Sequence, residues 1–162
     1  MIEVKDLKKG FGGDELVLKG ISTKFEKGKT NLIIGQSGSG KTVFLKCLLG
    51  LFRPTEGRIV YDGEAYSDLS SEKQRTLREQ MGMVFQGSAL FDSMTVEENI
   101  MFPLKMFTKQ RKAERRERAN EVIKRVNLIN ANNKLPSEIS GGMQKRVAIA
   151  RAIVNNPKYL FC

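Results

Sequence analysis

The sequence contains no histidine among its 162 residues. A chain without histidine cannot supply the imidazole of a Ser-His-Asp triad or an imidazole ligand for a metal ion. It has only two cysteines, Cys47 and Cys162, which form no closely spaced pair. Neither a disulfide framework nor a zinc site is therefore expected, and both cysteines are predicted to be small core residues.

Long apolar runs are also lacking. No stretch approaches the roughly 20 residues that span a bilayer, and residues 1–6 have no apolar signal core, so the protein is expected to stay in the cytoplasm. Hydrophobic residues make up 40% of the chain and charged residues 28%, which is typical of a soluble globular domain.

Acidic residues are in deficit, and the net charge is +10. Much of the basic excess lies between Lys105 and Arg125. This excess is compatible with a nucleic acid or an anionic membrane as partner, with a solvated helix face, or with an acidic part of the protein outside these residues.

One stretch fits a phosphate-binding pattern at every defined position. It consists of Gly35, Gln36, Ser37, Gly38, Ser39, Gly40, Lys41 and Thr42. Glycines allow successive backbone N–H groups to point at phosphate oxygens, the lysine adds a positive charge for the β- and γ-phosphates, and the threonine hydroxyl can bind Mg²⁺. The alternative is a chance Gly-rich turn, which the flanking pattern disfavours.

The residues on either side of this stretch have the pattern that a phosphate loop requires. Residues 30–34 are predicted to form a short buried strand, and residues 43–49 a helix with an apolar face. The positive end of that helix dipole would then lie beneath the phosphates.

The remaining pattern before residue 87 indicates antiparallel strands followed by β-α-β alternation. Ser71 and Gln74 form a capping box for a helix that ends near residue 80. The sequence predicts strands over residues 2–5, 17–18, 21–25, 58–61 and 81–85, with a turn at 62–63. This is the layout of an α/β nucleotide-binding core.

After residue 87 the pattern becomes helical. Helices are predicted over residues 95–107, with an interruption at Pro103, over 108–126, and over 141–155. The second helix is strongly charged and has a thin apolar stripe, which consists of Ala119, Val122, Ile123 and Val126. A loop at 130–136 and a strand beginning at Lys158 complete the prediction.

A second candidate anion site lies at the start of the last helix. Ser140 is a strong N-cap, and Gly141 and Gly142 leave the first backbone amides bare. From these residues alone, an anion site and an ordinary capped helix are equally compatible with the pattern.

Three motifs together resemble the ATP-binding cassette (ABC) ATPases. They are the loop 35–42, Gln86 after a strand, and the run Ile139-Ser140-Gly141-Gly142-Met143-Gln144-Lys145-Arg146-Val147-Ala148-Ile149-Ala150-Arg151-Ala152. Met143 replaces the glutamine that is usual in the family signature. This departure, together with residues 85–96, resembles the Mla-type branch, which moves phospholipid in bacterial envelopes.

The resemblance implies an α/β P-loop NTPase fold of the ABC type. It combines an antiparallel β subdomain with a RecA-like core and a helical insertion, here incomplete at its C-terminal side. A single partial domain is expected over residues 1–162: a core with the phosphate loop over 1–86, a helical subdomain over 87–140, and the signature helix and next strand over 141–162.

The resemblance also implies roles for single residues, with ATP and Mg²⁺ as cofactors. Phe11 matches the aromatic residue that stacks on adenine, and its alternative is a core residue at the edge of a turn. Gln86 matches the catalytic glutamine that reaches Mg²⁺ and the attacking water. Ser140, Gly141 and Gly142 match the signature that caps the γ-phosphate of ATP held by a second copy.

The expected partners are therefore a second copy in a head-to-tail dimer and membrane-spanning permease subunits on the inner face of the cell membrane, with no nucleic acid. Adaptable side chains suit a groove for a permease helix, although internal packing accounts for most of them. They are Leu90, Phe91, Met94, Met101, Phe102, Leu104, Met106 and Phe107. The basic helix 108–126 could lie near anionic lipid, but a solvated face is favoured.

In this family the strand that begins at Lys158 continues into an Asp that holds Mg²⁺ and a Glu that polarises water. The sequence ends at Cys162, before both. A polypeptide of these residues is expected to bind nucleotide weakly without turning it over. The alternatives are a soluble family member that acts on DNA or ribosomes, a truncated module that blocks intact subunits, and, more distantly, a P-loop kinase.

Overall fold

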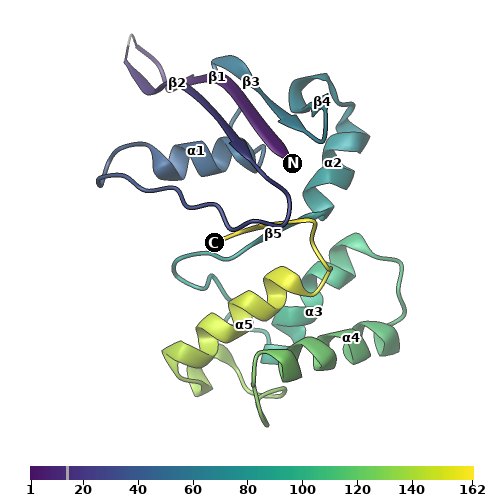
Figure 1. Ribbon diagram of the computed structural model, residues 1–162. Coiled ribbons are helices and arrows are strands. Elements are labelled where there is room, and N and C mark those ends of the chain that lie inside the picture. The colour runs from purple at the N-terminus through teal and green to yellow at the C-terminus, as the bar shows by residue number, and fades with distance from the viewer. Residues whose placement is uncertain (14) are drawn as a thin grey trace. The chain divides into compact units, whose positions relative to one another are not determined.

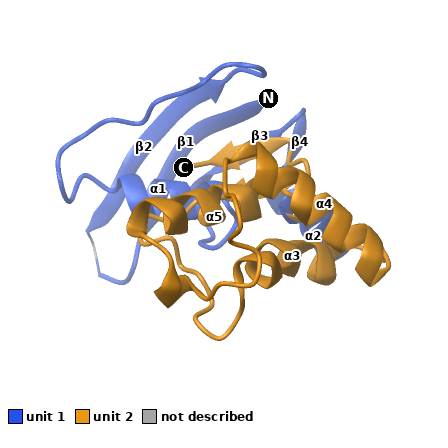
Figure 2. Ribbon diagram, turned by 90° about the horizontal axis from the view of Figure 1, so that it is seen from below, with its two compact units in different colours: residues 1–78 blue, residues 79–162 orange. Residues whose placement is uncertain are grey.

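The computed structural model describes residues 1–13 and 15–162 (Figure 1). The chain forms two compact units, residues 1–78 and residues 79–162 (Figure 2). No helix in the described ranges combines the length and the apolar character that a membrane span requires.

The first unit is built on an antiparallel sheet in the order β2-β1-β3-β4. Its strands are β1 (Ile2–Gly10), β2 (Leu16–Phe25), β3 (Glu56–Tyr61) and β4 (Glu64–Ala65). The two predicted segments 17–18 and 21–25 are therefore parts of one strand. The turn at 62–63 joins β3 to β4 as predicted.

Helix α1 (Lys41–Leu48) lies against β2 (Figure 1). Its buried face consists of Phe44, Cys47 and Leu48, and the ring of Phe44 lies 6.3 Å from the ring of Phe25. The prediction that Cys47 is a core residue is confirmed, since it is 1% exposed. Cys162 is exposed, so the same prediction for it is wrong. It follows the last strand and lies outside the strand's ladder.

The predicted buried strand over residues 30–34 is wrong. Leu32 and Ile34 are 83% and 81% exposed, and these residues have no strand conformation. A strand is stabilised by ladder hydrogen bonds to a neighbour, and neither sheet in the described part of the chain includes this segment. The apolar composition therefore predicted burial that no neighbouring strand provides.

The helix predicted to end near residue 80 is present as α2 (Ser71–Glu79), but it begins one residue earlier than the predicted capping box implies, and that box is wrong. Ser70 Oγ accepts a hydrogen bond from the Lys73 amide at 3.3 Å, so Ser70 caps the helix instead of Ser71. The Gln74 side chain donates to the carbonyl oxygens of Tyr66 and Leu69, at 3.1 and 3.2 Å. The glutamine thus ties the helix to the preceding 3-10 turn.

The second unit combines a parallel strand pair with three helices. Strands β5 (Met81–Met83) and β6 (Tyr159–Phe161) pair in parallel. The helices are α3 (Val96–Phe107), α4 (Lys112–Arg125) and α5 (Gly141–Ile153). Their core contains residues from all three helices, and Val154 directly after α5 joins it: Val96, Ile100, Leu104, Ala119, Val122, Ile123, Val147, Ala150 and Val154.

Two helix predictions after residue 87 need correction. Helix α3 continues through Pro103, because burial of Ile100 and Leu104 stabilises the helix on both sides of the proline. Helix α4 begins at Lys112 and not at residue 108, since the Arg111 amide donates to the Glu114 carboxylate at 2.7 Å and fixes the first turn there. The predicted apolar stripe of this helix is confirmed: Ala119, Val122 and Ile123 are buried, and Val126 is partly buried.

One buried polar side chain shapes the loop before α3. Asn99 is 0% exposed, and its Nδ2 donates to the carbonyl oxygens of Phe91, Met94 and Thr95 at 3.0–3.1 Å. Its Oδ1 accepts from the Phe91 amide at 2.8 Å. One side chain therefore satisfies four backbone groups of the segment that follows Gln86.

Replacing Asn99 with leucine is expected to destabilise the protein by about 2–4 kcal/mol, because several backbone groups lose their partner in a part-buried site. Chemical denaturation measures the change in the free energy of unfolding. Asn133→Leu at an exposed position is the matched control, expected within about 0.5 kcal/mol of the parent. Equal stabilities for the two variants would contradict the structural role of Asn99.

Candidate functional site

The loop over residues 35–42 leads into α1 with a backbone that requires glycine. Gly38 and Gly40 have positive φ angles of 82° and 89°. A Cβ on Gly40 would lie only 2.8 Å from the Leu18 side chain. Gly40 is the N-cap of α1, no side chain among the described residues caps this helix, and its first turn has no acidic residue. The first amides of α1 are therefore available to an anion.

Lys41 places its ammonium group directly over this loop. Its Nζ donates to the carbonyl oxygens of Gly35 and Gln36, each at 2.7 Å. The Ser39 amide also donates to the Gln36 carbonyl at 3.2 Å, which closes the loop on itself. Thr42 is exposed in the first turn. The loop thus combines a cation, bare amides and a hydroxyl within eight consecutive residues.

Phe11 lies in the turn between β1 and β2 and is 56% exposed. The Phe52 ring meets it edge to face, with ring centroids 5.1 Å apart. The Lys9 ammonium lies 4.9 Å from the Phe11 centroid. Phe11 is therefore a supported but exposed ring in the same unit as the loop, which is what stacking on a flat base requires. The supporting contact with Phe52 was not predicted, because 41 positions separate the two residues in the sequence.

Gln86 lies in an exposed turn after β5, in the second unit. The segment that follows is held by Arg151 of α5, which donates to the carbonyl oxygens of Ser88 and Ala89, each at 2.8 Å. Both residues have positive φ angles, 60° and 46°. Burial lowers the pKa of the Arg151 guanidinium. The sequence singled out Arg151 only as part of the run 139–152, with no sign of this contact.

Ser140 caps α5 as predicted. Its Oγ accepts from the Met143 amide at 3.3 Å. Gly141 and Gly142 are exposed, and the first turn of α5 contains no acidic residue. The second helix start therefore also offers backbone amides to an anion. Phe11 and the loop 35–42 belong to the first unit, while Gln86 and Ser140–Gly142 belong to the second.

These residues fit a triphosphate with its divalent cation better than they fit a metal held by the protein alone. In residues 1–13 and 15–162, no group of three or more Cys, Asp or Glu side chains could hold a metal ion. The bare first turn of α1 and the Lys41 ammonium suit phosphate oxygens. Mg²⁺ usually binds through one or two protein groups together with substrate phosphates.

The comparisons with known proteins agree with this chemistry. The family model described as "ABC transporter" matches residues 18–162. The chain is 40% identical over 161 residues to a probable ribonucleotide transport ATP-binding protein of Mycobacterium leprae, covering 99% of this chain and 46% of that protein. It is 42% identical over 162 residues to a methionine import ATP-binding protein of Clostridium tetani, covering 100% of this chain and 50% of that one.

A solved structure has the same fold. It is the dimeric post-hydrolysis state of the ATP-binding cassette MJ0796 bound to ADP and Pi, with a TM-score of 0.85 and 36% identity. The match covers 97% of this chain and 71% of that one. The chain spans about half the length of the curated relatives it matches. Its fold is that of an α/β P-loop NTPase of the ABC type, and the chain belongs to the ABC transporter family as an ATP-binding domain.

Proposed function

We propose that the protein is the ATP-hydrolysing motor subunit of an ABC transporter. The observation that carries the proposal is the loop 35–42, where the Lys41 ammonium lies over a Gly-rich turn at the uncapped start of α1. A triphosphate placed there meets backbone amides and a cation without having to displace any acidic group of that helix turn.

Each site residue has a role in this proposal. The amides of Gly35, Gln36, Ser37, Gly38, Ser39 and Gly40 surround the β-phosphate, with those of Lys41 and Thr42. Lys41 exchanges its two carbonyl partners for phosphate oxygens. The Thr42 hydroxyl and the Gln86 amide are the protein groups that would hold Mg²⁺, which supplies charge neutralisation for phosphoryl transfer. Phe11 offers its exposed ring to adenine.

The second helix start serves a different nucleotide. Ser140, Gly141 and Gly142 present their amides to the γ-phosphate of ATP held by a second copy, in a head-to-tail dimer with two-fold symmetry. The dimeric state of the similar cassette MJ0796 supports this arrangement. One chain then contributes to two composite sites. This accounts for the two helix starts, those of α1 and α5, whose first turns contain no acidic residue.

Hydrolysis requires carboxylates that follow β6 in the family pattern. The polypeptide 1–162 has no acidic residue after Glu138. We expect it to bind ATP but to turn it over at least about 1,000-fold more slowly than a full-length homologous subunit, since both charged groups that position metal and water are missing. A steady-state phosphate-release assay on purified 1–162 measures this, and turnover comparable to a full-length subunit would contradict it.

The transported molecule is proposed to be a phospholipid or another hydrophobic compound, and the subunit to lie on the cytoplasmic face of the membrane with permease subunits. The two relatives are named for ribonucleotide transport and for methionine import. Similarity between ATP-binding subunits therefore does not identify the transported molecule. Support comes from the residues on either side of Gln86, where Phe85 and Phe91 are 46% and 40% exposed. Such side chains suit a short permease helix.

Affinity purification of the tagged protein from detergent-solubilised membranes tests this partner. Recovery of a membrane-spanning permease supports the transport proposal. The net charge of +10 favours one second candidate, a soluble family member that acts on nucleic acid. Recovery of ribosomes or DNA without a permease would support that candidate and overturn the first.

A further inference from the structure

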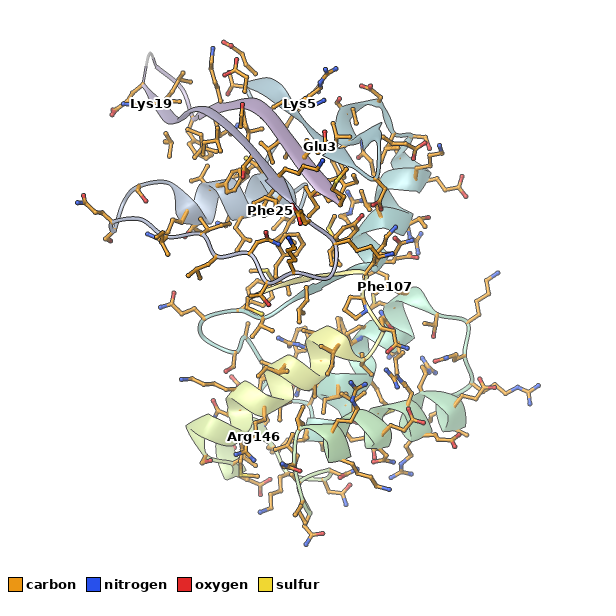
Figure 3. All side chains as sticks on the ribbon, viewed as in Figure 1. Glu3, Lys5, Lys19, Phe25, Phe107 and Arg146 are labelled. Atoms are coloured by element: carbon orange, nitrogen blue, oxygen red, sulfur yellow. The ribbon has the colours of Figure 1, made fainter. Side chains whose placement is uncertain are left out.

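The connection between α3 and α4 is strongly basic. Residues 105–112 contain four exposed cations and no acidic residue: Lys105, Lys109, Arg111 and Lys112. We call residues 105–112 the basic corner. It lies entirely in the second unit, and Figure 3 labels one of its residues, Phe107, at the end of α3. A concentration of four positive charges in eight residues attracts anions over a Debye length.

The cations of the basic corner have no ion-pair partner in the described part of the chain, whereas two arginines further along α4 do. Arg116 lies 2.9 Å from Glu97, and Arg118 lies 2.7 Å from Glu121. The nearest acidic residue to the corner, Glu114, uses its carboxylate to accept the Arg111 backbone amide at 2.7 Å. Arg116 and Arg118 are therefore paired with carboxylates, and the four cations of the corner remain available to an anion.

The basic corner also exposes two large apolar side chains. Met106 and Phe107 are 53% and 44% exposed, and they lie between Lys105 and Lys109 in the sequence. Exposed apolar side chains flanked by lysines are typical of segments that lie at a lipid interface, where the apolar groups enter the acyl boundary and the cations contact headgroups. A solvated helix face, the interpretation favoured by the sequence pattern, has no need of these two side chains.

Nucleic acid is less well matched to the same residues. Single-stranded nucleic acid is bound by several aromatic rings along a basic groove. The corner has one aromatic ring, Phe107, and the flexible Met106 beside it. We propose that the basic corner binds the headgroups of anionic phospholipids, an inference that rests on the proposed function because it places the motor subunit against the membrane of its transporter.

Vesicle co-sedimentation tests the proposal on the whole protein. The corner variant carries Lys105→Gln, Lys109→Gln, Arg111→Gln and Lys112→Gln. The control variant loses the same charge from exposed positions of the first unit, through Lys19→Gln, Lys24→Gln, Lys27→Gln and Lys29→Gln. Circular dichroism verifies that both variants fold. The vesicles contain either phosphatidylglycerol mixed with phosphatidylcholine or phosphatidylcholine alone.

The corner variant is expected to bind phosphatidylglycerol vesicles about 50-fold or more weakly than the parent, and the control variant less than about threefold more weakly. A second variant, Met106→Ser with Phe107→Ser, is expected to lose the part of the binding that persists at high salt. Equal losses in the corner and control variants, or parent-like binding by the corner variant, would overturn the proposal. The proposal would also be overturned if the corner variant lost binding to a single-stranded RNA while its binding to vesicles stayed unchanged.

Failure of this inference is separable from failure of the proposed function. Binding of a fluorescent ATP analogue is measured on the same preparations, and the corner variant is expected to retain parent affinity because it leaves the loop 35–42 unchanged. Absence of vesicle binding with intact nucleotide binding refutes only the lipid contact. Absence of nucleotide binding in the parent refutes the motor function. The vesicle result then still decides whether the basic corner binds anionic lipid.

Discussion

Replacing Lys41 with alanine is expected to lower the affinity for ATP about 100-fold or more and to abolish turnover by the full-length protein. The substitution removes the only ammonium group that the loop 35–42 holds over itself, through two contacts of 2.7 Å. It also leaves the carbonyl oxygens of Gly35 and Gln36 without the ammonium group that donates to them. Titration with a fluorescent ATP analogue measures the affinity.

Lys46→Ala is the matched control for this experiment. Lys46 is the other cation of α1, lies in the last turn of the same helix and is exposed. Its ammonium lies 5.1 Å from the centroid of the Phe52 ring. We expect less than about a threefold change in affinity from this variant. Parent-like binding by the Lys41 variant would refute the loop as the phosphate site.

The features that the sequence predicted correctly are set by neighbouring residues. The helix predicted over residues 43–49 is present as α1, although it begins two residues earlier, at Lys41. This helix and the Ser140 cap of α5 depend on backbone conformation and hydrogen bonds within four residues. The apolar stripe of α4 follows from helical periodicity and is buried as predicted. Such local signals are contained in a short window of sequence, which is why the elements that carry the candidate site were found.

Some predictions failed because they depend on residues far away in the sequence, whereas the cap of α2 and the start of α4 were misplaced by a few residues and are set by local hydrogen bonds. Whether residues 30–34 form a strand depends on a neighbouring strand, and no window around them reveals whether one is hydrogen-bonded there. The helix α3 continues through Pro103 because its apolar side chains are buried by other helices. The segments 17–18 and 21–25 were predicted separately, yet they form one strand in which Gly20 adopts a φ of 98°.

The sequence predicted the residues of the candidate site but not the contacts that hold them in place. The sequence gives no indication that the Phe52 ring would hold Phe11, or that Arg151 would hold the backbone after Gln86 across more than 60 positions. Both contacts join segments that only the fold brings together. The roles of Phe11 and Gln86 remain predictions. The predicted division of the chain at residues 86 and 140 also remains a prediction, and the two compact units of the structure meet in the sequence between residues 78 and 79.

Replacing Gly141 with aspartate is expected to lower ATP turnover by the full-length protein about 100- to 1,000-fold while nucleotide affinity stays near that of the parent. Gly141 is the first residue of α5, and a Cβ there would meet no atom within 4 Å in the described part of the chain, so the substitution should not disturb packing. The carboxylate occupies the start of the helix dipole and repels the γ-phosphate that the proposal places there.

Ser71→Asp provides the control, because it adds a carboxylate at the first residue of α2, a helix with no proposed role in the site. This variant is expected to retain full turnover. The separation of affinity from turnover is the decisive result, because in the proposed dimer the nucleotide bound by one chain meets the α5 start of the other chain. If Gly141→Asp weakened binding by the monomeric chain as much as Lys41→Ala, the second helix start would serve the chain's own nucleotide, and the proposed head-to-tail pairing would be wrong.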